Sequence, residues 1–116
     1  MNNTRYNVLN KLLRRLEKKG IKRRYIEALL SGEFVKDEYV SWIVIEEARK
    51  LDPEIVLEDE IGGIDVEPVY VLLLKVEDIL IGYCAAPNKH QVKIYDKVRE
   101  QQAINELTSF LEEYSL

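Results

Sequence analysis

Cationic side chains, the groups that bind phosphate, are concentrated at the start of this chain. Residues 1–24 hold nine lysines and arginines against a single carboxylate, Glu17, which gives a net charge of +8. Residues 25–116 hold the other 8 basic and 20 acidic residues, so the overall charge of -4 conceals a strong segregation. Several cations on one surface can neutralise a stretch of nucleic-acid backbone. We therefore expect a phosphate backbone to meet this segment. An acidic protein, an anionic membrane surface and the chain's own acidic part are the alternatives.

A helix over residues 4–19 is predicted to hold these cations on one side. Leucines recur at helical spacing between positions 9 and 16, and Gly20 can end the helix in a left-handed turn. At about 100° per residue, the leucines cluster on one face and the cations fall opposite them. A second group of cations opens the next predicted helix. The predicted nucleic-acid contacts on these two helices are Lys11, Arg14, Arg15, Lys18, Lys22, Arg23 and Arg24.

Apolar periodicity predicts the other elements as well. The predicted helices span residues 4–19, 22–30, 37–51 and 97–114, and Asp37 and Asp96 are expected to cap the last two. The predicted strands span residues 55–57, 69–76, 79–86 and 91–95, with an acidic turn over 58–65 and a hairpin at 77–78. The predicted fold class is α+β, with an N-terminal three-helix bundle, an antiparallel β meander of three or four strands and a C-terminal helix. We expect one domain over residues 1–116, basic and helical over 1–52 and acidic over 53–116.

The last predicted helix carries an apolar stripe with two candidate uses. Its inward residues are expected to be Val98, Ile104, Leu107, Phe110, Leu111 and Tyr114. The stripe either covers the sheet or pairs with a second copy of the chain. We favour a homodimer, because two copies on one nucleic acid add their contacts.

The segment from Leu12 to Ser31 resembles the helix-turn-helix of repressor-type DNA-binding domains. Gly20 stands in the turn, and Ile26 and Leu29 stand at the buried positions of the recognition helix, with Leu30 also expected inside. The resemblance implies that the following residues face the DNA groove: Lys22, Arg23, Arg24 and Glu27. The sequence departs from the family at three positions. Leu16 is large where the family usually has a small residue, and Arg15 and Lys19 are charged where the family normally has apolar residues.

A second resemblance covers residues 9–50. The run from Leu12 to Ile21, followed by apolar residues over 26–30 and by Lys36 to Val40, looks like one three-helix module of the RecX regulators of recombinase. Those proteins repeat the module and lack a β meander, so the likeness is to a three-helix pattern. Both families are associated with DNA.

Acidic residues before the second predicted strand are the best candidates for catalysis. Asp65 and Glu67 precede a strand that ends near Lys75, an order similar to that of the PD-(D/E)xK nucleases. In those enzymes two carboxylates hold Mg²⁺ and a lysine assists the attacking water. Leu73 stands where the second metal ligand is needed. A solvated acidic turn is therefore the preferred interpretation, and a Mg²⁺-dependent nuclease is the third hypothesis.

The remaining reactive side chains do not indicate a zinc site or a catalytic triad. With one histidine and one cysteine, the chain cannot assemble the usual zinc site, and a Ser-His-Asp triad has no support. We expect His90 to lie exposed in a turn, Cys84 to be a small core residue, and no cofactor or metal to be bound. Tyr70, Tyr83 and Tyr95 alternate with aliphatic residues, which favours packing over base stacking.

These patterns favour a small non-enzymatic protein that binds duplex DNA, of the helix-turn-helix regulator kind. The alternative is an adaptor or inhibitor whose basic face binds an acidic protein. We expect a cytoplasmic location with no membrane span. The apolar runs are too short to cross a bilayer, the first residues contain no apolar signal core, and the lone cysteine excludes an internal disulfide.

Overall fold

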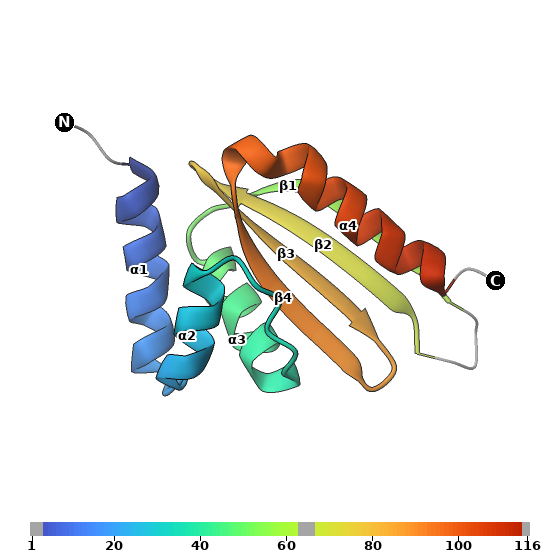
Figure 1. The fold of residues 1–116 in the computed structure, drawn as a ribbon, viewed down its shortest axis with the longest axis horizontal. Coiled ribbons are helices and arrows are strands. Elements are labelled where there is room, and N and C mark those ends of the chain that lie inside the picture. Colours follow the sequence, from blue (N-terminus) through green and yellow to red (C-terminus); the bar gives the residue numbers. More distant parts are fainter. Residues whose placement is uncertain (1–3, 63–66, 115–116) are drawn as a thin grey trace.

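The computed structural model describes the backbone of residues 4–62 and 67–114, and the side chains from residue 8 onward within these ranges. The helices that come first are α1 (Thr4–Lys18), α2 (Arg23–Leu30) and α3 (Glu38–Arg49). The strands that follow are β1 (Glu54–Ile61), β2 (Val69–Val76), β3 (Ile79–Ala86) and β4 (Lys89–Asp96). A 3₁₀ turn, η1 (Lys97–Arg99), then leads into α4 (Glu100–Glu113), as Figure 1 shows. This order confirms the predicted α+β class, with a helical bundle, a meander and a closing helix.

The strands form an antiparallel sheet in the order β1-β2-β3-β4, so each strand pairs with its neighbour in the sequence. Because side chains alternate between the two faces of a strand, the central strands contribute to two cores. Leu72, Leu74 and Ile81 pack with residues of α1, α2 and α3 on one face. Leu73 and Leu80 pack with residues of α4 on the other. The sheet therefore separates a layer of three helices from a single helix (Figure 1).

Local signals set the ends of the first helices. The Asp37 carboxylate accepts a hydrogen bond from the Val40 backbone N–H at 2.9 Å, which confirms the predicted cap of α3. Gly20 follows α1 with a φ of +83°, a conformation that residues with a side chain rarely adopt. The backbone N–H of buried Ile21 donates to the Leu16 carbonyl at 3.1 Å. The short connection between α1 and α2 is thus held by a left-handed glycine and by its own backbone hydrogen bonds.

The first strand is longer than the sequence predicts. Glu58, Asp59 and Glu60, which the sequence places in an acidic turn, belong to β1 and pair with β2. That pairing consists of backbone hydrogen bonds from another strand, which the local side-chain pattern does not report. β1 lies at the edge of the sheet, where exposed charges discourage pairing with another chain.

The last strand and helix also differ from the prediction at their ends. β4 covers residues 89–96 rather than 91–95, and a 3₁₀ turn precedes α4 where the sequence predicts the first turn of the helix. Val98 lies in that turn and is 91% exposed, so the prediction that it faces the core is wrong. Tyr114, also predicted to face inward, is 39% exposed at the end of α4. Asp96 precedes the 3₁₀ turn, and its side chain makes no capping hydrogen bond there.

The apolar stripe of α4 covers the sheet, which is one of the two uses predicted for it. Its buried residues are Ala103, Leu107, Phe110 and Leu111. They pack closely on the strands: a Cβ added to Gly82 of β3 would lie 3.0 Å from the Tyr95 ring and 3.6 Å from Leu107. Neither α4 nor any other helix in the described ranges has the length and apolar character needed to cross a membrane.

Candidate nucleic-acid interface

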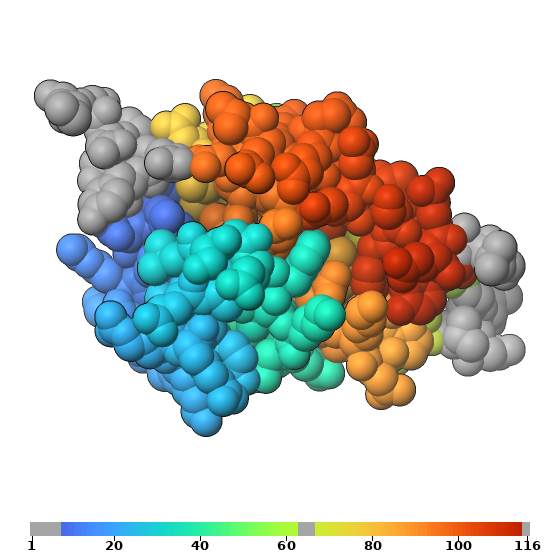
Figure 2. Space-filling view, in the orientation of Figure 1, coloured from blue at the N-terminus to red at the C-terminus, as the bar shows by residue number. Residues whose placement is uncertain are grey.

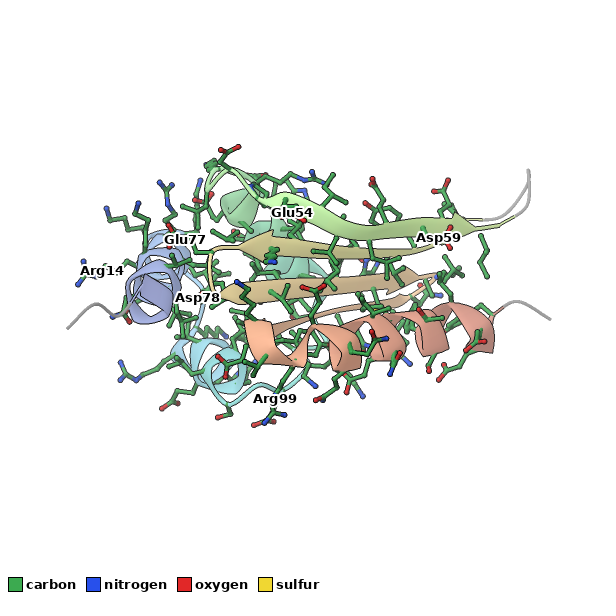
Figure 3. The ribbon with its side chains drawn as sticks, turned by 90° about the horizontal axis from the view of Figure 1, so that it is seen from above. Arg14, Glu54, Asp59, Glu77, Asp78 and Arg99 are labelled. Atoms are coloured by element: carbon green, nitrogen blue, oxygen red, sulfur yellow. The ribbon has the colours of Figure 1, made fainter. Side chains whose placement is uncertain are left out.

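α1 divides into an apolar face and a cationic face. Leu12 and Leu16 are fully buried in the core between the helices and the sheet. Lys11, Arg14 and Lys18 are exposed. Figure 3 shows Arg14 projecting from α1 away from the sheet, at one end of the molecule. The amphipathic division that the sequence predicts for this helix is therefore confirmed.

A cationic hollow of about 560 Å³, here called the α1–α3 cleft, lies between these two helices. Its lining residues are Asn10, Lys11, Arg14, Arg15, Lys18, Lys19, Glu47 and Lys50. Six of them are cations and one is a carboxylate, and a cleft lined by one sign of charge concentrates ions of the other sign. The cleft brings together the four cations predicted on the first helix. It adds Lys19 and Lys50, which are not among the predicted contacts.

A buried carboxylate, Glu47 of α3, organises one side of the cleft. Its side chain is only 2% exposed and accepts a hydrogen bond from Lys50 Nζ at 2.9 Å. Arg15 Nη1 lies 3.4 Å from Glu47 Oε1, and Lys19 Nζ lies 3.8 Å from Glu47 Oε2. A buried charge is costly unless it is paired, and here three cations pair with it. Because one negative charge meets three positive ones, the group keeps a positive surplus.

The protonation of Glu47 follows from these contacts. The hydrogen bond from Lys50 holds the pKa of Glu47 below its ordinary value, although burial acts in the opposite direction. Arg15 and Lys19 lower the pKa further. Glu47 is therefore ionised at neutral pH and holds the charged ends of three cations at one side of the cleft.

The other cations of the cleft are not neutralised in this way. Within the part of the chain that the structure describes, Lys11, Arg14 and Lys18 form no ion pair with a carboxylate. An anion entering the cleft would thus meet three exposed charges on α1 in addition to the Glu47 group. Asn10 contributes an amide at the same surface.

The predicted cations at the start of α2 form a separate group. Lys22, Arg23 and Arg24 are exposed, and in Figure 2 α2 (light blue) projects from the lower left of the molecule. They do not line the α1–α3 cleft. Arg23 instead borders a second hollow, between α1 and α2, which it shares with Arg14. Arg14 lines both hollows, and the second hollow also contains the carboxylates of Glu17 and Glu27.

Contacts within the chain already engage part of this second group. Arg23 Nε lies 4.0 Å from Glu27, and the Arg24 guanidinium sits 4.8 Å from the centre of the Tyr25 ring. Ile26 and Leu29 are buried, as the helix-turn-helix resemblance implies. Leu30 was expected inside as well but is 54% exposed and lines the hollow between α1 and α2, so that prediction is wrong.

A signal for Glu47 is present in the sequence. It stands in the inward helical stripe of α3 with Val40, Ile43, Val44 and Ala48, where a carboxylate implies a buried partner. Lys50 follows it by three residues, a spacing that allows a pair on one helix. The contribution of α1 depends on the packing of α1 beside α3, which no local pattern reports.

An exposed aromatic pair lies on α3. Tyr39 and Trp42 are each 55% exposed, and their ring centroids are 6.4 Å apart. Trp42 points outward, because the inward stripe is centred on Val40, Val44 and Ala48.

A row of polar side chains lies on the face of the sheet that α1, α2 and α3 cover. His90 lies in β4 and is mostly buried, so the prediction of an exposed turn residue is wrong. Its Nδ1 is 3.0 Å from the Tyr83 hydroxyl, and its Nε2 is 3.4 Å from Glu38. Tyr70 donates to Glu58 at 2.6 Å and packs edge-on against Tyr83. Burial, together with the bond to Glu58, raises the pKa of Tyr70 to about 12, and burial also raises the pKa of Tyr83. Both tyrosines are therefore neutral at physiological pH.

The nuclease hypothesis requires carboxylates that could hold a metal ion together. These residues contain no group of three histidine, cysteine or acidic side chains that could hold a metal ion. Asp65 of the nuclease hypothesis lies outside them, Glu67 is exposed, and Lys75 Nζ lies 3.8 Å from Glu100. Cys84 is buried, as predicted, and burial raises the pKa of its thiol to about 12.

No protein-family model matches this chain, and no curated protein and no solved structure gives a significant match. The likenesses to the helix-turn-helix and to the RecX module therefore rest on the residues quoted for them.

Proposed function

We propose that this protein is a small non-enzymatic DNA-binding protein that holds the phosphate backbone in the α1–α3 cleft. The observation that carries the proposal is the presence of six cations and one carboxylate around a single hollow. Glu47 uses its charge to hold three of the six in place, and Lys11, Arg14 and Lys18 are left for the ligand. Neutralising phosphates with clustered lysine and arginine is the main source of sequence-independent affinity for nucleic acid.

The cations at the start of α2 extend this surface. Lys22 and Arg24 are exposed and form no ion pair among the described residues, and Arg23 shares the hollow between α1 and α2 with Arg14. In a regulator of the helix-turn-helix kind, they would reach the backbone or the groove from the first turn of the second helix. Together with Lys11, Arg14 and Lys18, Lys22 and Arg24 make five of the predicted contact residues that form no ion pair with a carboxylate among the described residues.

A gel-shift titration of duplex DNA at several salt concentrations tests the proposal. Five phosphate contacts give a slope of about -4.5 in a plot of log affinity against log salt. The triple variant Lys11→Glu, Arg14→Glu, Lys18→Glu is expected to weaken binding at least about tenfold and to reduce the slope by about 3. Binding that is absent at about 50 mM salt, or that is indifferent to salt, would falsify the proposal.

A control variant with the same change of net charge tests whether the position of the cations, rather than the net charge, determines binding. Lys89, Lys97 and Arg99 are exposed, and they give the same change of net charge when all three become glutamate. They lie outside the cleft, and Figure 3 places Arg99 on the α4 side of the molecule. The control variant is expected to keep most of the affinity and the full salt slope. Equal losses in both variants would contradict the assignment to the cleft.

Two copies on one DNA molecule are part of the same proposal. Each copy would add its own phosphate contacts, which raises the combined affinity without new chemistry. The apolar stripe of α4 is buried on the sheet, so the copies would meet through the DNA or another surface. The stoichiometry of the complex, measured by sedimentation, distinguishes one copy from two.

Related experiments also test the two alternative functions. An adaptor or inhibitor would bind an acidic protein through the same cations, and polyglutamate would then compete better than DNA of equal charge. A nuclease would cleave labelled DNA when Mg²⁺ is added, and cleavage that an Asp65→Ala variant abolishes would replace the binding proposal with a catalytic one.

A further inference from the structure

The aromatic pair on α3 leaves more than half of each side chain exposed in the part of the protein that the structure describes. Tyr39 and Trp42 lie one helical turn apart, each 55% exposed, with their rings tilted by 46°. Buried side chains from the inward stripe of the same helix supply its contact with the sheet. An adjacent tryptophan and tyrosine left open to solvent are a recurrent feature of binding surfaces.

The same face of α3 leads to the cationic cleft. Arg49 follows Trp42 by seven residues and Lys50 follows Tyr39 by eleven, spacings that place each pair on one stripe of a helix. At 1.5 Å per residue, the rings and the cations are about 10–16 Å apart along the axis. Lys50 lines the α1–α3 cleft. The rings and the cleft are therefore parts of one surface.

Two carboxylates on this face indicate which part of a ligand would lie there. Glu38 is directed toward His90 at 3.4 Å, and Glu46 follows Trp42 by one turn. Carboxylates repel phosphates, whereas every base is uncharged and has a π face that stacks on an aromatic ring. The distribution of charge assigns phosphates to the cleft and bases to Tyr39 and Trp42.

We infer that Tyr39 and Trp42 stack unpaired bases of a nucleic acid whose phosphates lie in the α1–α3 cleft. This inference rests on the proposed function and deepens it, because it specifies a single strand or a duplex with an unpaired segment. In an intact duplex the bases stack on one another and cannot reach the rings. Stacking by aromatic side chains tolerates any base sequence, which suits a cleft built from point charges.

The chain contains one tryptophan, so intrinsic tryptophan fluorescence reports on Trp42 alone. Three DNA ligands of about 12 nucleotides per strand are titrated: a single strand, a blunt duplex, and an abasic single strand with the same phosphates. Gel shift measures binding, and Trp42 emission measures stacking. All three ligands are expected to bind, and only the single strand that carries bases is expected to quench the emission.

Substitutions at Trp42 distinguish the loss of an aromatic ring from a loss of folding. Trp42→Ala is expected to weaken binding of the single strand about tenfold and to leave the blunt duplex and the abasic strand unchanged. Trp42→Phe keeps a ring and is expected to retain most of the affinity. Tyr114→Ala removes an exposed ring from α4, on the other side of the sheet, and is expected to change nothing.

The outcomes distinguish this inference from the function on which it rests. A single strand that binds without quenching Trp42 overturns the stacking inference and leaves DNA binding in place. A Trp42→Ala variant that loses all three ligands equally also overturns it. Failure of every ligand to bind at about 50 mM salt overturns the function itself. Quenching by polyglutamate but not by single-stranded DNA replaces the nucleic acid with an acidic protein.

Discussion

The carboxylate of Glu47 stabilises the fold and positions the cleft at the same time. It is buried, and it holds Arg15, Lys19 and Lys50 within 4 Å. Without it, these three cations would face one another across a hollow that already contains three more. Both the stability of the fold and the positions of these three cations therefore depend on the ionised carboxylate of Glu47.

We expect Glu47→Gln to lower the free energy of unfolding at neutral pH by about 2 kcal/mol, through loss of charge-assisted hydrogen bonds. The folded pKa of Glu47 lies below the ordinary value of 4.5. Its contribution is therefore complete above pH 4.5 and is lost as the pH falls through the folded pKa. Urea unfolding of both proteins at several pH values should show the difference between them shrinking below pH 4.5 and then vanishing.

The neighbouring Glu46 provides the control for this experiment. Glu46→Gln makes the same chemical change, but Glu46 forms no ion pair among the described residues. Its effect should stay within about 0.5 kcal/mol at every pH. A Glu47→Gln protein as stable as the natural one, or a difference independent of pH, would contradict the role given to Glu47.

Some residues of the site could be predicted from the sequence alone, and others could not. The cations of α1 could be assigned to an exposed face because helical periodicity relates them directly to the leucines. Glu47 could have been found by its place in an inward stripe. The contacts of His90 with Tyr83 and Glu38 could not, because they join β4, β3 and α3 across the fold.

At the scale of elements, the turn between α1 and α2 sets how the two cationic groups meet. Gly20 has a φ of +83°, and a Cβ added to it would meet no atom within 4 Å. Any cost of a side chain at this position therefore comes from the backbone conformation alone. The turn joins Lys19, which lines the cleft, to Lys22 at the start of α2.

Gly20→Ala is expected to lower the free energy of unfolding by about 1 kcal/mol, because a left-handed backbone is unfavourable for a residue with a Cβ. Gly20→Asn should cost less, since asparagine tolerates this conformation by hydrogen bonding locally. Urea unfolding of the three proteins gives the order glycine, asparagine, alanine. Equal stability of all three would show that the turn does not require its present conformation.

The elements differ in how well their bounds could be predicted. α1, α2 and α3 follow a period of 3.6 residues and were predicted to within a few residues, since their hydrogen bonds are internal. β1 was predicted at less than half its length, because Glu58, Asp59 and Glu60 are held in the sheet by β2. The cleft depends on the side-by-side packing of α1 and α3, which lies beyond any pattern within one element.

At the scale of the whole molecule, the cationic cleft lies toward one end of the longest dimension. The protein measures 49 × 29 × 23 Å. Figure 3 places Arg14 at one end and Asp59 near the other, with Glu77 and Asp78 of the β2–β3 turn at the same end as Arg14, and Figure 1 shows that the C-terminal end of α4 lies away from α1. The exposed cations of α1 and of the α1–α3 cleft can attract an anion to this end of the molecule before contact. The net charge of -4 thus says little about what the cationic cleft binds.

Removing carboxylates that lie far from the cleft tests whether the local cations or the net charge governs binding. In the triple variant Asp59→Asn, Glu60→Gln, Glu113→Gln, three exposed carboxylates are removed far from the cleft, and the net charge rises from -4 to -1. At about 0.15 M salt the screening length is about 8 Å, so the affinity for DNA should change less than about twofold. At about 0.01 M salt it is about 30 Å, and the variant should bind more tightly than the natural protein. Gel shifts at both concentrations measure this, and equal tightening at both would mean that net charge, rather than the α1–α3 cleft, governs binding.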